Sequence, residues 1–339
     1  MRQLTLIEAN TLRWLDVPEP RLTSGHAAIV RPIAVAVCDF DRAVITGRYP
    51  ALTHPIAVGH EIVAEVIEVG SQVHTVSIGM QVILPLHISC GSCPSCRIGH
   101  TNSCNARPPL SNYGLGSRGG DWGGGMSDLL LVPYADAMAV PKPANLSAAD
   151  CAAIGCNLVD MYRTVAPYIA TLTESRILIV GGMAHNMALY GVVIAQALGV
   201  QRIDFLDDDP ARLNAASALG AHSITLADKA QLKPFPIVAD CSGDPERLAI
   251  ALSLVGADGV CTPVWPYAGS IKLPVGAMFL RNAILVTGQP HARAHIEPIL
   301  DLMQEATFSS TSIPAEILPW EQAHDTFGFG ERKRIFIRS

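Results

Sequence analysis

The sequence predicts an α/β protein of two domains, one built from short strands and one from a doubly wound parallel sheet covered by helices. The chain has 339 residues, which is too long for a single ordinary core. Residues 1–140 contain short alternating runs rich in Val, Ile, Pro and Gly, a pattern typical of strands joined by turns. Residues 176–209 instead follow the order strand, glycine turn, apolar helix, strand and acid, which is the order of a dinucleotide-binding βαβ unit.

The composition excludes several classes of function. Hydrophobic residues make up 49% of the chain and charged residues 16%, which describes a compact protein with large buried sheets. A net charge of −6 implies no basic face, so nucleic acid is not an expected partner. No apolar run approaches the roughly 20 uncharged residues of a membrane helix, and Met1–Leu4 begins no signal-peptide pattern. We therefore expect a cytoplasmic protein whose nine cysteines stay reduced, so that clustered ones bind metal.

Further elements follow from apolar runs and their boundaries. Strands of a barrel-like β domain are predicted at Ala27–Val35, Glu61–Val69 and Gln81–Pro85. Strands of the parallel sheet are predicted at Arg176–Val180, Arg202–Leu206, Ile237–Cys241, Gly259–Pro263 and Ala283–Gly288, because their apolar residues do not alternate. Helices are predicted at Pro245–Val255, Ile296–Glu305 and Ile317–Phe327.

Four cysteines within 15 residues give the strongest single motif. They are Cys90, Cys93, Cys96 and Cys104. Four thiolates at this spacing close a tetrahedron around one zinc ion and leave no position for chemistry, so we predict a structural site. The alternatives are a chance cluster of buried cysteines and an iron–sulfur cluster. The bacterial ferredoxin run has a three-residue gap and a Cys-Pro ending, both of which are missing here.

A second constellation is scattered along the chain: Cys38, His60 and Cys156. One imidazole and two thiolates, with water as fourth ligand, would form an open catalytic zinc site. Glu61 is a candidate to replace that water during turnover. Each residue alone has a simpler interpretation, since a lone cysteine among apolar neighbours is usually core and a lone histidine is usually a satisfied buried side chain.

The βαβ unit supplies the candidate dinucleotide site. Gly181 is expected to make the tight turn after the strand, Gly182 to let the backbone approach the cofactor, and Ala188 to allow close packing of the helix on the sheet. Asn186 is a residue that tolerates positive φ. The loop is about two residues longer than the usual glycine motif, and a generic α/β protein could show the same pattern.

Acidic residues after the second strand bear on cofactor choice. Asp207 and Asp208 would hold ribose hydroxyls and repel a 2′-phosphate, and no arginine stands immediately after the strand. We therefore expect NAD(H) over NADP(H). Asp209 also suits the N-cap of a helix starting at Pro210, so the acidic run has a structural explanation as well. Ser242 follows a later strand, at a carboxyl end where ligands bind in such sheets.

These motifs resemble those of the zinc-containing medium-chain dehydrogenase/reductase family, the alcohol dehydrogenase type, over nearly the whole chain. The resemblance is carried by Gly59-His60-Glu61, the four-cysteine lobe, Gly123-Gly124, Val132-Pro133 and the βαβ unit with its Asp207-x-x-Pro-x-Arg-Leu run. It implies a GroES-like β-barrel catalytic domain, residues 1–157 and 293–339, with a zinc lobe at about 88–106 and a last barrel strand Lys333–Ile337. A Rossmann NAD-binding domain, residues 158–292, would be inserted between its parts.

The resemblance also implies residue roles. Cys38, His60 and Cys156 would ligate a catalytic zinc, and Asp41 would orient His60. Three positions depart from the family's pattern: Phe40 replaces the usual Ser or Thr of the proton relay, Ala43 replaces its histidine, and Asp160 replaces a threonine near the nicotinamide. Asp160, Asp39 or water would then carry the proton, although Asp160 is as readily a solvated or helix-stabilising carboxylate.

The function implied is an NAD-dependent zinc oxidoreductase that acts between an alcohol and an aldehyde or ketone, with two zinc ions per chain. Phe40, Trp122 and Trp265 are candidate pocket walls that equally suit core packing. By analogy we expect a homodimer or homotetramer. The alternatives are a reductase of activated C=C or C=N bonds and a non-catalytic protein that binds zinc and a dinucleotide.

Overall fold

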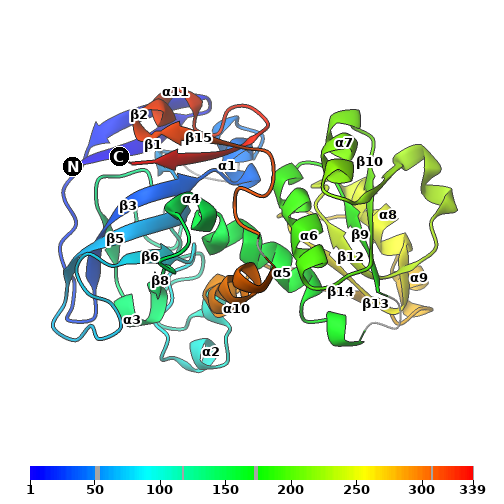
Figure 1. Ribbon diagram of the computed structural model, residues 1–339, viewed down its shortest axis with the longest axis horizontal. Helices are drawn as coiled ribbons and strands as arrows, with labels where there is room; N and C mark the ends of the chain where they lie inside the picture. The colour runs from blue at the N-terminus through cyan, green and yellow to red at the C-terminus, as the bar shows by residue number, and fades with distance from the viewer. Residues whose placement is uncertain (50–53, 117, 172–174, 307, 339) are drawn as a thin grey trace. The chain divides into compact units, whose positions relative to one another are not determined.

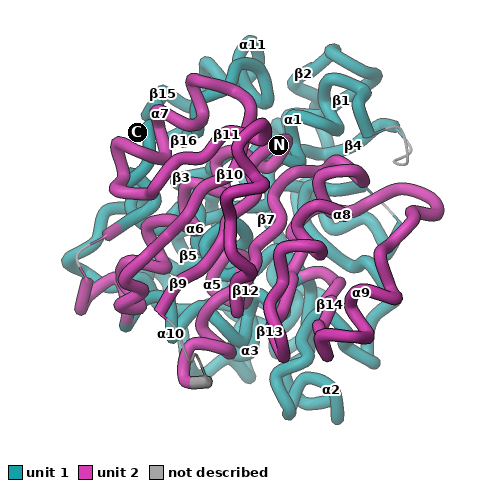
Figure 2. The backbone as a smooth tube through the Cα atoms, turned by 90° about the vertical axis from the view of Figure 1, so that its right-hand side faces the viewer, with its two compact units in different colours: residues 1–159, 290–301, 309–339 teal, residues 160–289, 302–308 magenta. Residues whose placement is uncertain are grey.

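The computed structural model describes residues 1–49, 54–116, 118–171, 175–306 and 308–338, which divide into two compact units (Figures 1 and 2). Unit 1 comprises residues 1–159, 290–301 and 309–339, and unit 2 comprises residues 160–289 and 302–308. Unit 1 contains the mainly antiparallel strands and unit 2 a parallel sheet. No helix among the described residues is long and apolar enough to cross a membrane.

Unit 1 is built on two sheets. A three-stranded sheet has the order β2-β1-β4, and a seven-stranded sheet has the order β15-β16-β3-β5-β6-β8 with β7 paired to β3. The strands are β1 (Arg2–Glu8), β2 (Thr11–Asp16), β3 (Ala28–Ala36), β4 (Ile56–Ala57), β5 (Glu61–Val69), β6 (Gln81–Leu84), β7 (Leu130–Val132), β8 (Val140–Pro141), β15 (Ala315–Pro319) and β16 (Lys333–Ile337). Because β16 pairs antiparallel with β3, the last strand of the chain lies in the same sheet as strands from its N-terminal part (Figure 1).

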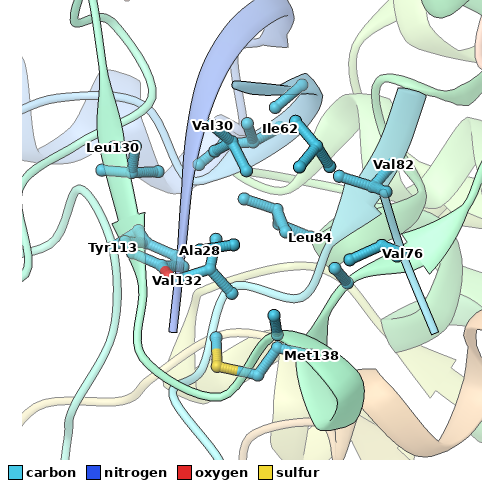
Figure 3. Packing of buried hydrophobic residues seen from close by; sticks show 14 of the residues in the cluster. Ala28, Val30, Ile62, Val76, Val82, Leu84, Tyr113, Leu130, Val132 and Met138 are labelled. Atoms are coloured by element: carbon cyan, nitrogen blue, oxygen red, sulfur yellow. The ribbon is translucent and has the colours of Figure 1, made fainter. Parts of the chain in front are cut away.

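The strands of unit 1 enclose an apolar core (Figure 3). Val30 of β3, Ile62 of β5 and Leu84 of β6 point into it, and Val132 and Met138 close it from later in the chain. All of these side chains are buried, and most other residues of β3, β5 and β6 are buried as well, so both faces of this part of the sheet are covered.

The helical segments of unit 1 are short, and several carry site residues. They are α1 (Asp39–Ile45), α2 (Pro94–Arg97), η1 (Thr101–Ser103), α3 (Ala135–Met138), α4 (Ala148–Cys151), the π-helical turn η2 (Ile154–Leu158), η5 (Trp320–Gln322) and α11 (Ala323–Thr326). The turn η2 leads directly into α5 (Val159–Val165). Helix α10 (Ala292–Ala306) begins in unit 1 and ends in unit 2.

Unit 2 contains a six-stranded parallel sheet with the order β11-β10-β9-β12-β13-β14. The strands are β9 (Arg176–Val180), β10 (Arg202–Asp207), β11 (His222–Thr225), β12 (Phe235–Asp240), β13 (Val255–Pro263) and β14 (Ile284–Leu285). Numbered from β9, this is the order 3-2-1-4-5-6 of a doubly wound sheet, which confirms the predicted fold class. The order reverses between β9 and β12, so ligands are expected at the carboxyl ends of those two strands.

Helices follow the strands of unit 2. They are α6 (His185–Ala197), α7 (Pro210–Ala218), α8 (Pro245–Ser253) and α9 (Val275–Phe279), with the 3₁₀ segments η3 (Ile169–Thr171) and η4 (Leu226–Gln231). Asp209 and Asp244 cap α7 and α8 by accepting two backbone N–H groups each, and a proline follows each cap. Helix α6 is buried along most of its length, which explains its almost wholly apolar sequence.

Two predicted elements differ from the structure. The segment Ile317–Phe327 is not one helix, because its first part belongs to β15 and pairs parallel with β16 before η5 and α11 follow. The strand predicted at Ala283–Gly288 is reduced to β14, since only Ile284 and Leu285 pair with β13. Both segments contain the apolar residues on which the predictions were based, but pairing with a neighbouring strand determines which residues form a strand.

Candidate zinc and cofactor sites

The four-cysteine lobe brings all its predicted ligands together. The sulfur atoms of Cys90, Cys93, Cys96 and Cys104 lie within 4.8 Å of one another. Backbone N–H groups of Cys93, Cys90 and Asn105 donate to the sulfur atoms of Cys90, Cys104 and Cys93 at 3.4 Å each. Zinc binds cysteines as thiolates, which these N–H groups would stabilise, and the arrangement of four sulfur donors fits a closed structural site.

The lobe's electrostatics favour ionised sulfur at its exposed side. Backbone N–H groups of Cys96 and Asn105 lower the pKa of Cys93 to about 6. Burial instead raises the pKa of Cys96 to about 12. Four adjacent sulfur atoms resist sharing negative charge, and a divalent cation removes that conflict.

The second predicted trio also assembles. Cys38 follows β3, His60 immediately precedes β5, and Cys156 lies in the turn η2, yet their ligand atoms lie within 4.8 Å of one another. All three residues are buried. Neighbouring ligands of a tetrahedral zinc lie about 3.5–3.8 Å apart, given the usual Zn–S and Zn–N distances. The donor set of the Cys38–His60–Cys156 trio therefore fits zinc, with a fourth position left open.

Local structure fixes each ligand. Cys38 is the N-cap of α1, and its sulfur accepts the Phe40 N–H at 3.4 Å. One carboxylate contacts two ligand residues, because Asp41 Oδ2 accepts the Cys38 N–H at 3.0 Å while Oδ1 lies 3.1 Å from His60 Nδ1. Gly155 lets Cys156 approach β6, since a Cβ at this position would lie 2.2 Å from the Leu84 carbonyl oxygen.

Charges within the trio reinforce one another. A hydrogen bond from Cys156 lowers the pKa of Cys38 well below its usual value, against the effect of burial, and His60 lowers it further. Burial alone would lower the pKa of His60, but Asp41 and Cys38 raise it well above its usual value. The buried Cys38 thiolate is thus stabilised by a hydrogen bond and by nearby positive charge, and a metal ion would add to that positive charge.

Glu61 has contacts that differ from those of a zinc ligand. Its Oε1 accepts the Asn157 N–H at 3.0 Å, and its Oε2 forms an ion pair with Lys333. Both side chains of the pair are fully buried. Burial raises the pKa of Glu61 to about 7, with Lys333 acting in the opposite direction. Ligation of zinc by Glu61 stays a prediction.

Sequence reasoning missed Lys333 and Asn157. Lys333 lies in the last strand, 272 positions from Glu61 in the sequence, and no local sequence pattern predicts that the two residues pair. Asn157 stands next to a predicted ligand, and its side chain contacts both Cys38 and Lys333. A polar residue inside the buried run Ile154–Leu158 was the one available signal.

The candidate proton carriers are all paired. Asp39 is buried and lies 3.7 Å from Arg42. Asp160, in α5, accepts a 2.6 Å hydrogen bond from Arg163 Nε. Phe40 packs edge-to-face on Tyr49 at 4.8 Å between ring centroids. Ala43 is buried in α1.

The remaining two candidate pocket walls are placed as follows. The ring of Trp122 lies 5.0 Å from the Arg107 guanidinium, and its Nε1 donates to Gly119 O. Trp265 is buried in unit 2.

In unit 2 the glycine turn follows β9 at the switch point of the sheet. A Cβ on Gly181 would meet Asp207 Oδ2 at 2.3 Å, and one on Gly182 would meet the Ser242 carbonyl oxygen at 2.4 Å. Gly182 also has φ +156°. Both glycines are therefore required by close approach of the turn to β10 and to the end of β12.

Helix α6 begins at His185 without a side-chain cap. Asn186 lies in the first turn of this helix and is not among the described residues with positive φ. The tolerance of asparagine for positive φ therefore does not explain why it stands at this position. Ala188 is fully buried in the helix. Gly191 is also required to be small, because a Cβ there would lie 2.5 Å from Met161 and 3.1 Å from Ile179 of β9, and the sequence pattern did not predict this position.

Two arginines converge on the acidic pair, and sequence reasoning did not anticipate them. Arg212 donates to both oxygens of Asp207 at 2.7 Å, and Arg247 donates to Asp207 at 3.1 Å and to Asp208 at 2.6 Å. Burial alone would raise the pKa of Asp207, but Arg212 and the Asp208 N–H hold it well below its usual value. Asp207 is fully buried, whereas the side chain of Asp208 is 57% exposed.

Ser242 is buried at the end of β12 and belongs to a polar cluster. Its Oγ lies 3.1 Å from the hydroxyl of Tyr267 and accepts the Asp244 N–H at 3.2 Å. Tyr267 also donates to the buried carboxylate of Asp240, whose pKa is raised by burial. The cluster ties the loop after β13 to the carboxyl end of β12.

Known proteins share these features. Residues 24–142 match the family model of the alcohol dehydrogenase GroES-like domain. The chain is 26% identical to the probable zinc-binding alcohol dehydrogenase Rv1895 of Mycobacterium tuberculosis, over 100% of this chain and 88% of that protein. It is 25% identical to the acryloyl-coenzyme A reductase of Metallosphaera sedula, over 68% of this chain and 66% of that protein.

Solved structures agree with the sequence comparisons. The alcohol dehydrogenase TADH from Thermus sp. ATN1 superposes with a TM-score of 0.88 and 25% identity, and the match covers 100% of both chains. The GroES-like domain model falls within unit 1, and unit 2 has the doubly wound sheet expected of a Rossmann domain. The chain therefore belongs to the zinc-containing medium-chain dehydrogenase/reductase family, the alcohol dehydrogenase type, and is an oxidoreductase of that family.

Proposed function

We propose that the protein is a zinc-dependent oxidoreductase that transfers a hydride between NAD(H) and an alcohol or its aldehyde or ketone. The observation that carries this proposal is the buried trio of Cys38, His60 and Cys156, whose ligand atoms lie within 4.8 Å of one another. Zinc held by three protein ligands supplies Lewis-acid polarisation of a substrate oxygen through its open fourth position. Unit 1 would be the catalytic domain and unit 2 the NAD-binding domain.

The protein's own residues would hold and orient this centre. Asp41 contacts both His60 Nδ1 and the Cys38 N–H, so it fixes the ring's orientation and the start of α1 together. Because Nδ1 faces the Asp41 carboxylate, Nε2 would be the nitrogen that holds the zinc ion. We assign Cys38, His60 and Cys156 as ligands of the catalytic zinc, and the four-cysteine lobe as the structural site.

The cofactor assignment is supported by the switch point of the sheet. Gly181, Gly182, Asn186 and Ala188 form the turn and first helical residues after β9, and α6 begins there without a side-chain cap. Backbone N–H groups at a helix N-terminus and the helix dipole favour a pyrophosphate. We propose Asp207, Asp208 and Ser242 as further cofactor-binding residues.

We propose that NAD(H) is preferred over NADP(H). A 2′-phosphate at the end of β10 would approach the carboxylates of Asp207 and Asp208. The nearby guanidinium groups of Arg212 and Arg247 already pair with these acids. Transfer of Arg212 to the phosphate would break both of its hydrogen bonds to the buried carboxylate of Asp207, which is costly.

Asp160 is proposed as the residue that replaces the missing relay. Phe40 and Ala43 have no group that carries a proton, so a hydroxyl–imidazole path through these positions is not available. The carboxylate of Asp160 accepts a hydrogen bond from Arg163 Nε, which orients it.

A second candidate function is reduction of an activated C=C bond. Phe40 favours it, because such a reaction needs no polar group at this position for a substrate hydroxyl. Similarity to a protein named acryloyl-coenzyme A reductase points the same way. Product analysis separates the two: an enal reduced at its C=C bond favours the second candidate, and an alcohol oxidised with NADH formation favours the first.

The test of the main proposal is the zinc content per chain, measured before and after mild chelation together with NADH formation on a panel of alcohols. Two zinc ions, with activity lost alongside the more labile one, are expected. Cys38→Ser should then retain only the ion of the four-cysteine lobe, and Cys151→Ser, at a buried cysteine outside both clusters, should retain two. One zinc in the unaltered protein contradicts the catalytic site, and no hydride transfer to any substrate favours a binding protein.

A homodimer or homotetramer in the cytoplasm is also proposed. The exposed apolar side chains of α9 and the edge strand β14 support self-association through unit 2.

A further inference from the structure

Asn157 contacts every part of the buried polar centre in unit 1 except His60 and Asp41. Its Nδ2 lies 3.0 Å from Cys38 Sγ and 3.7 Å from Cys156 Sγ. Its Oδ1 accepts a 2.7 Å hydrogen bond from Lys333, and its backbone N–H donates to Glu61. One fully buried residue thus joins two proposed zinc ligands to the Glu61–Lys333 ion pair.

The orientation of this amide follows from chemistry. An ammonium group is a donor only, so the amide oxygen must face Lys333 and the amide nitrogen must face the sulfur atoms. The opposite orientation would place donors against the ammonium and an oxygen against the sulfur atoms. Lys333 therefore determines that Asn157 offers its two N–H groups to Cys38 and Cys156.

A hydrogen-bond donor that points at a ligand sulfur lowers the electron density that this sulfur donates to a metal ion. The bond draws negative charge from the thiolate, which lowers its donation to the ion and leaves the ion a stronger Lewis acid. The bond also holds the thiolate in place. The positive charge of Lys333 polarises the amide in the same direction, while the charge of Glu61 is balanced within the pair.

We propose that Asn157 is a positioning residue that sets the geometry and the electron donation of both cysteine ligands of the catalytic zinc, with Lys333 fixing its amide. The inference rests on the proposed zinc site. It goes beyond it because it assigns a role to two residues, Asn157 and Lys333, that bind neither metal nor substrate. A merely structural role would be limited to satisfying the buried ammonium of Lys333.

The substitution Asn157→Asp separates these roles. An aspartate keeps an oxygen acceptor for Lys333 but removes the N–H donors and sets a carboxylate oxygen toward the sulfur atoms. Asn112→Asp is the matched control, because Asn112 is also a buried asparagine whose Nδ2 donates within unit 1, to the Leu110 carbonyl at 2.7 Å. Asn157→Ala, which removes both side-chain contacts without adding charge, is the second variant in case the aspartate folds poorly.

Two measurements that do not depend on turnover read out the result. The first is the release rate of the labile zinc to a chromophoric chelator, expected to rise about 10–100-fold in both Asn157 variants, as is usual for loss of an outer hydrogen bond to a ligand. The second is the sulfur-to-cobalt charge-transfer band after exchange of the labile ion for Co²⁺. Loss of the N–H donors raises the energy of the sulfur lone pairs, so the band is expected to move to longer wavelength, while Asn112→Asp leaves it unmoved.

The possible outcomes test the role of Asn157 separately from the proposed catalytic zinc site. A protein that binds one zinc, in the four-cysteine lobe alone, overturns the catalytic site and this inference together. A labile second zinc with the same release rate and the same band in the unaltered protein, Asn157→Asp and Asn157→Ala overturns the inference alone and leaves the zinc site standing.

Discussion

Arg247 and Asp207 are joined at the carboxyl end of the parallel sheet, where Nη1 of the arginine lies 3.1 Å from Oδ1 of the aspartate. The same nitrogen donates to the Gly181 carbonyl oxygen at 3.0 Å. Arg247 comes from α8, Asp207 from the end of β10 and Gly181 from the turn after β9, so one guanidinium connects three segments that surround the proposed cofactor site. The positive charge of Arg247 is therefore paired with Asp207 and Asp208.

This relationship predicts that Asp208→Ala improves the use of NADP(H). Removing the exposed carboxylate releases Arg247 Nη2, which now donates to Asp208 at 2.6 Å, for a 2′-phosphate. A charge-assisted hydrogen bond contributes about 1.5–3 kcal/mol, so kcat/KM with NADP(H) should rise at least about tenfold. Asp228→Ala, at an exposed acid elsewhere in unit 2, serves as the control and should change neither cofactor's kinetics. A variant that gains nothing with NADP(H) would show that Arg247 does not reach the phosphate.

Sequence patterns were sufficient where a short apolar run has clear ends. Strand β9 occupies the predicted residues Arg176–Val180, and β5 occupies the predicted residues Glu61–Val69. The four-cysteine cluster was also predictable, because the Cys90–Cys104 spacing is local, whereas the ligand set of Cys38, His60 and Cys156 was implied by the family resemblance.

The missing parts depend on contacts between distant residues. Arg247 and Asp207 are 40 positions apart in the sequence, and Lys333 and Glu61 are 272 apart. Pairs this far apart produce no periodic pattern in the sequence from which they could be predicted. A buried lysine in a strand looks like any polar residue on an outer face until its partner is known. The same reason explains Ile317–Phe327, whose first residues become β15 only because β16 lies beside them.

The buried ion pair predicts an asymmetric response to mutation. Lys333→Met leaves Glu61 without its counter-ion in a fully buried position, so the free energy of unfolding should fall by about 3–5 kcal/mol. The double variant Glu61→Gln with Lys333→Met removes both charges and should recover at least half of that loss. Urea denaturation of the three proteins, each with its zinc content matched, measures the difference. Equal losses in the single and double variants would mean that packing, not charge, explains the effect.

Acid sensitivity is predicted for the carboxylate of Asp136 in α3. It accepts the His74 N–H at 2.9 Å and both the N–H and hydroxyl of Thr75 at 2.8 Å. Burial acts to raise the pKa of Asp136, but the N–H groups of Thr75 and His74 lower it below its usual value. A lowered pKa stabilises the fold above the ordinary carboxylate pKa and loses this effect as the pH falls.

Asp136→Asn should therefore cost about 1–2 kcal/mol of unfolding free energy at neutral pH and progressively less below about pH 4. Chemical denaturation of both proteins at neutral pH and below about pH 4 measures this difference. Asp301→Asn, at an exposed carboxylate of α10, is the control and should cost little at either pH. A cost for Asp136→Asn that is independent of pH would assign the effect to geometry and not to ionisation.

The edge of the parallel sheet predicts self-association. Strand β14 ends the sheet order, and next to it Phe279 and Leu280 are 82% and 84% exposed, with Ile284 of β14 itself 52% exposed. An apolar edge of this kind pairs readily with another chain. We expect a dimer or larger assembly by light scattering, and Phe279→Glu with Ile284→Lys should lower its mass. Ile78→Lys, at an exposed isoleucine of unit 1, should not, and an unaltered protein that is monomeric would contradict the prediction.

The final prediction concerns Asp160, which accepts from Arg163 Nε at 2.6 Å. If its carboxylate moves the proton, Asp160→Asn should lower kcat about 10²–10⁴-fold with zinc content and NAD affinity retained. Arg163→Gln is the informative companion, because Arg163 also donates to the carbonyl oxygens of Pro263 and Gly288. That variant keeps the carboxylate and removes only its partner, so it should retain much more turnover than Asp160→Asn. Equal loss of activity in both variants would mean that Asp160 acts only by holding Arg163 in place, and unchanged turnover in Asp160→Asn would leave the proton to water.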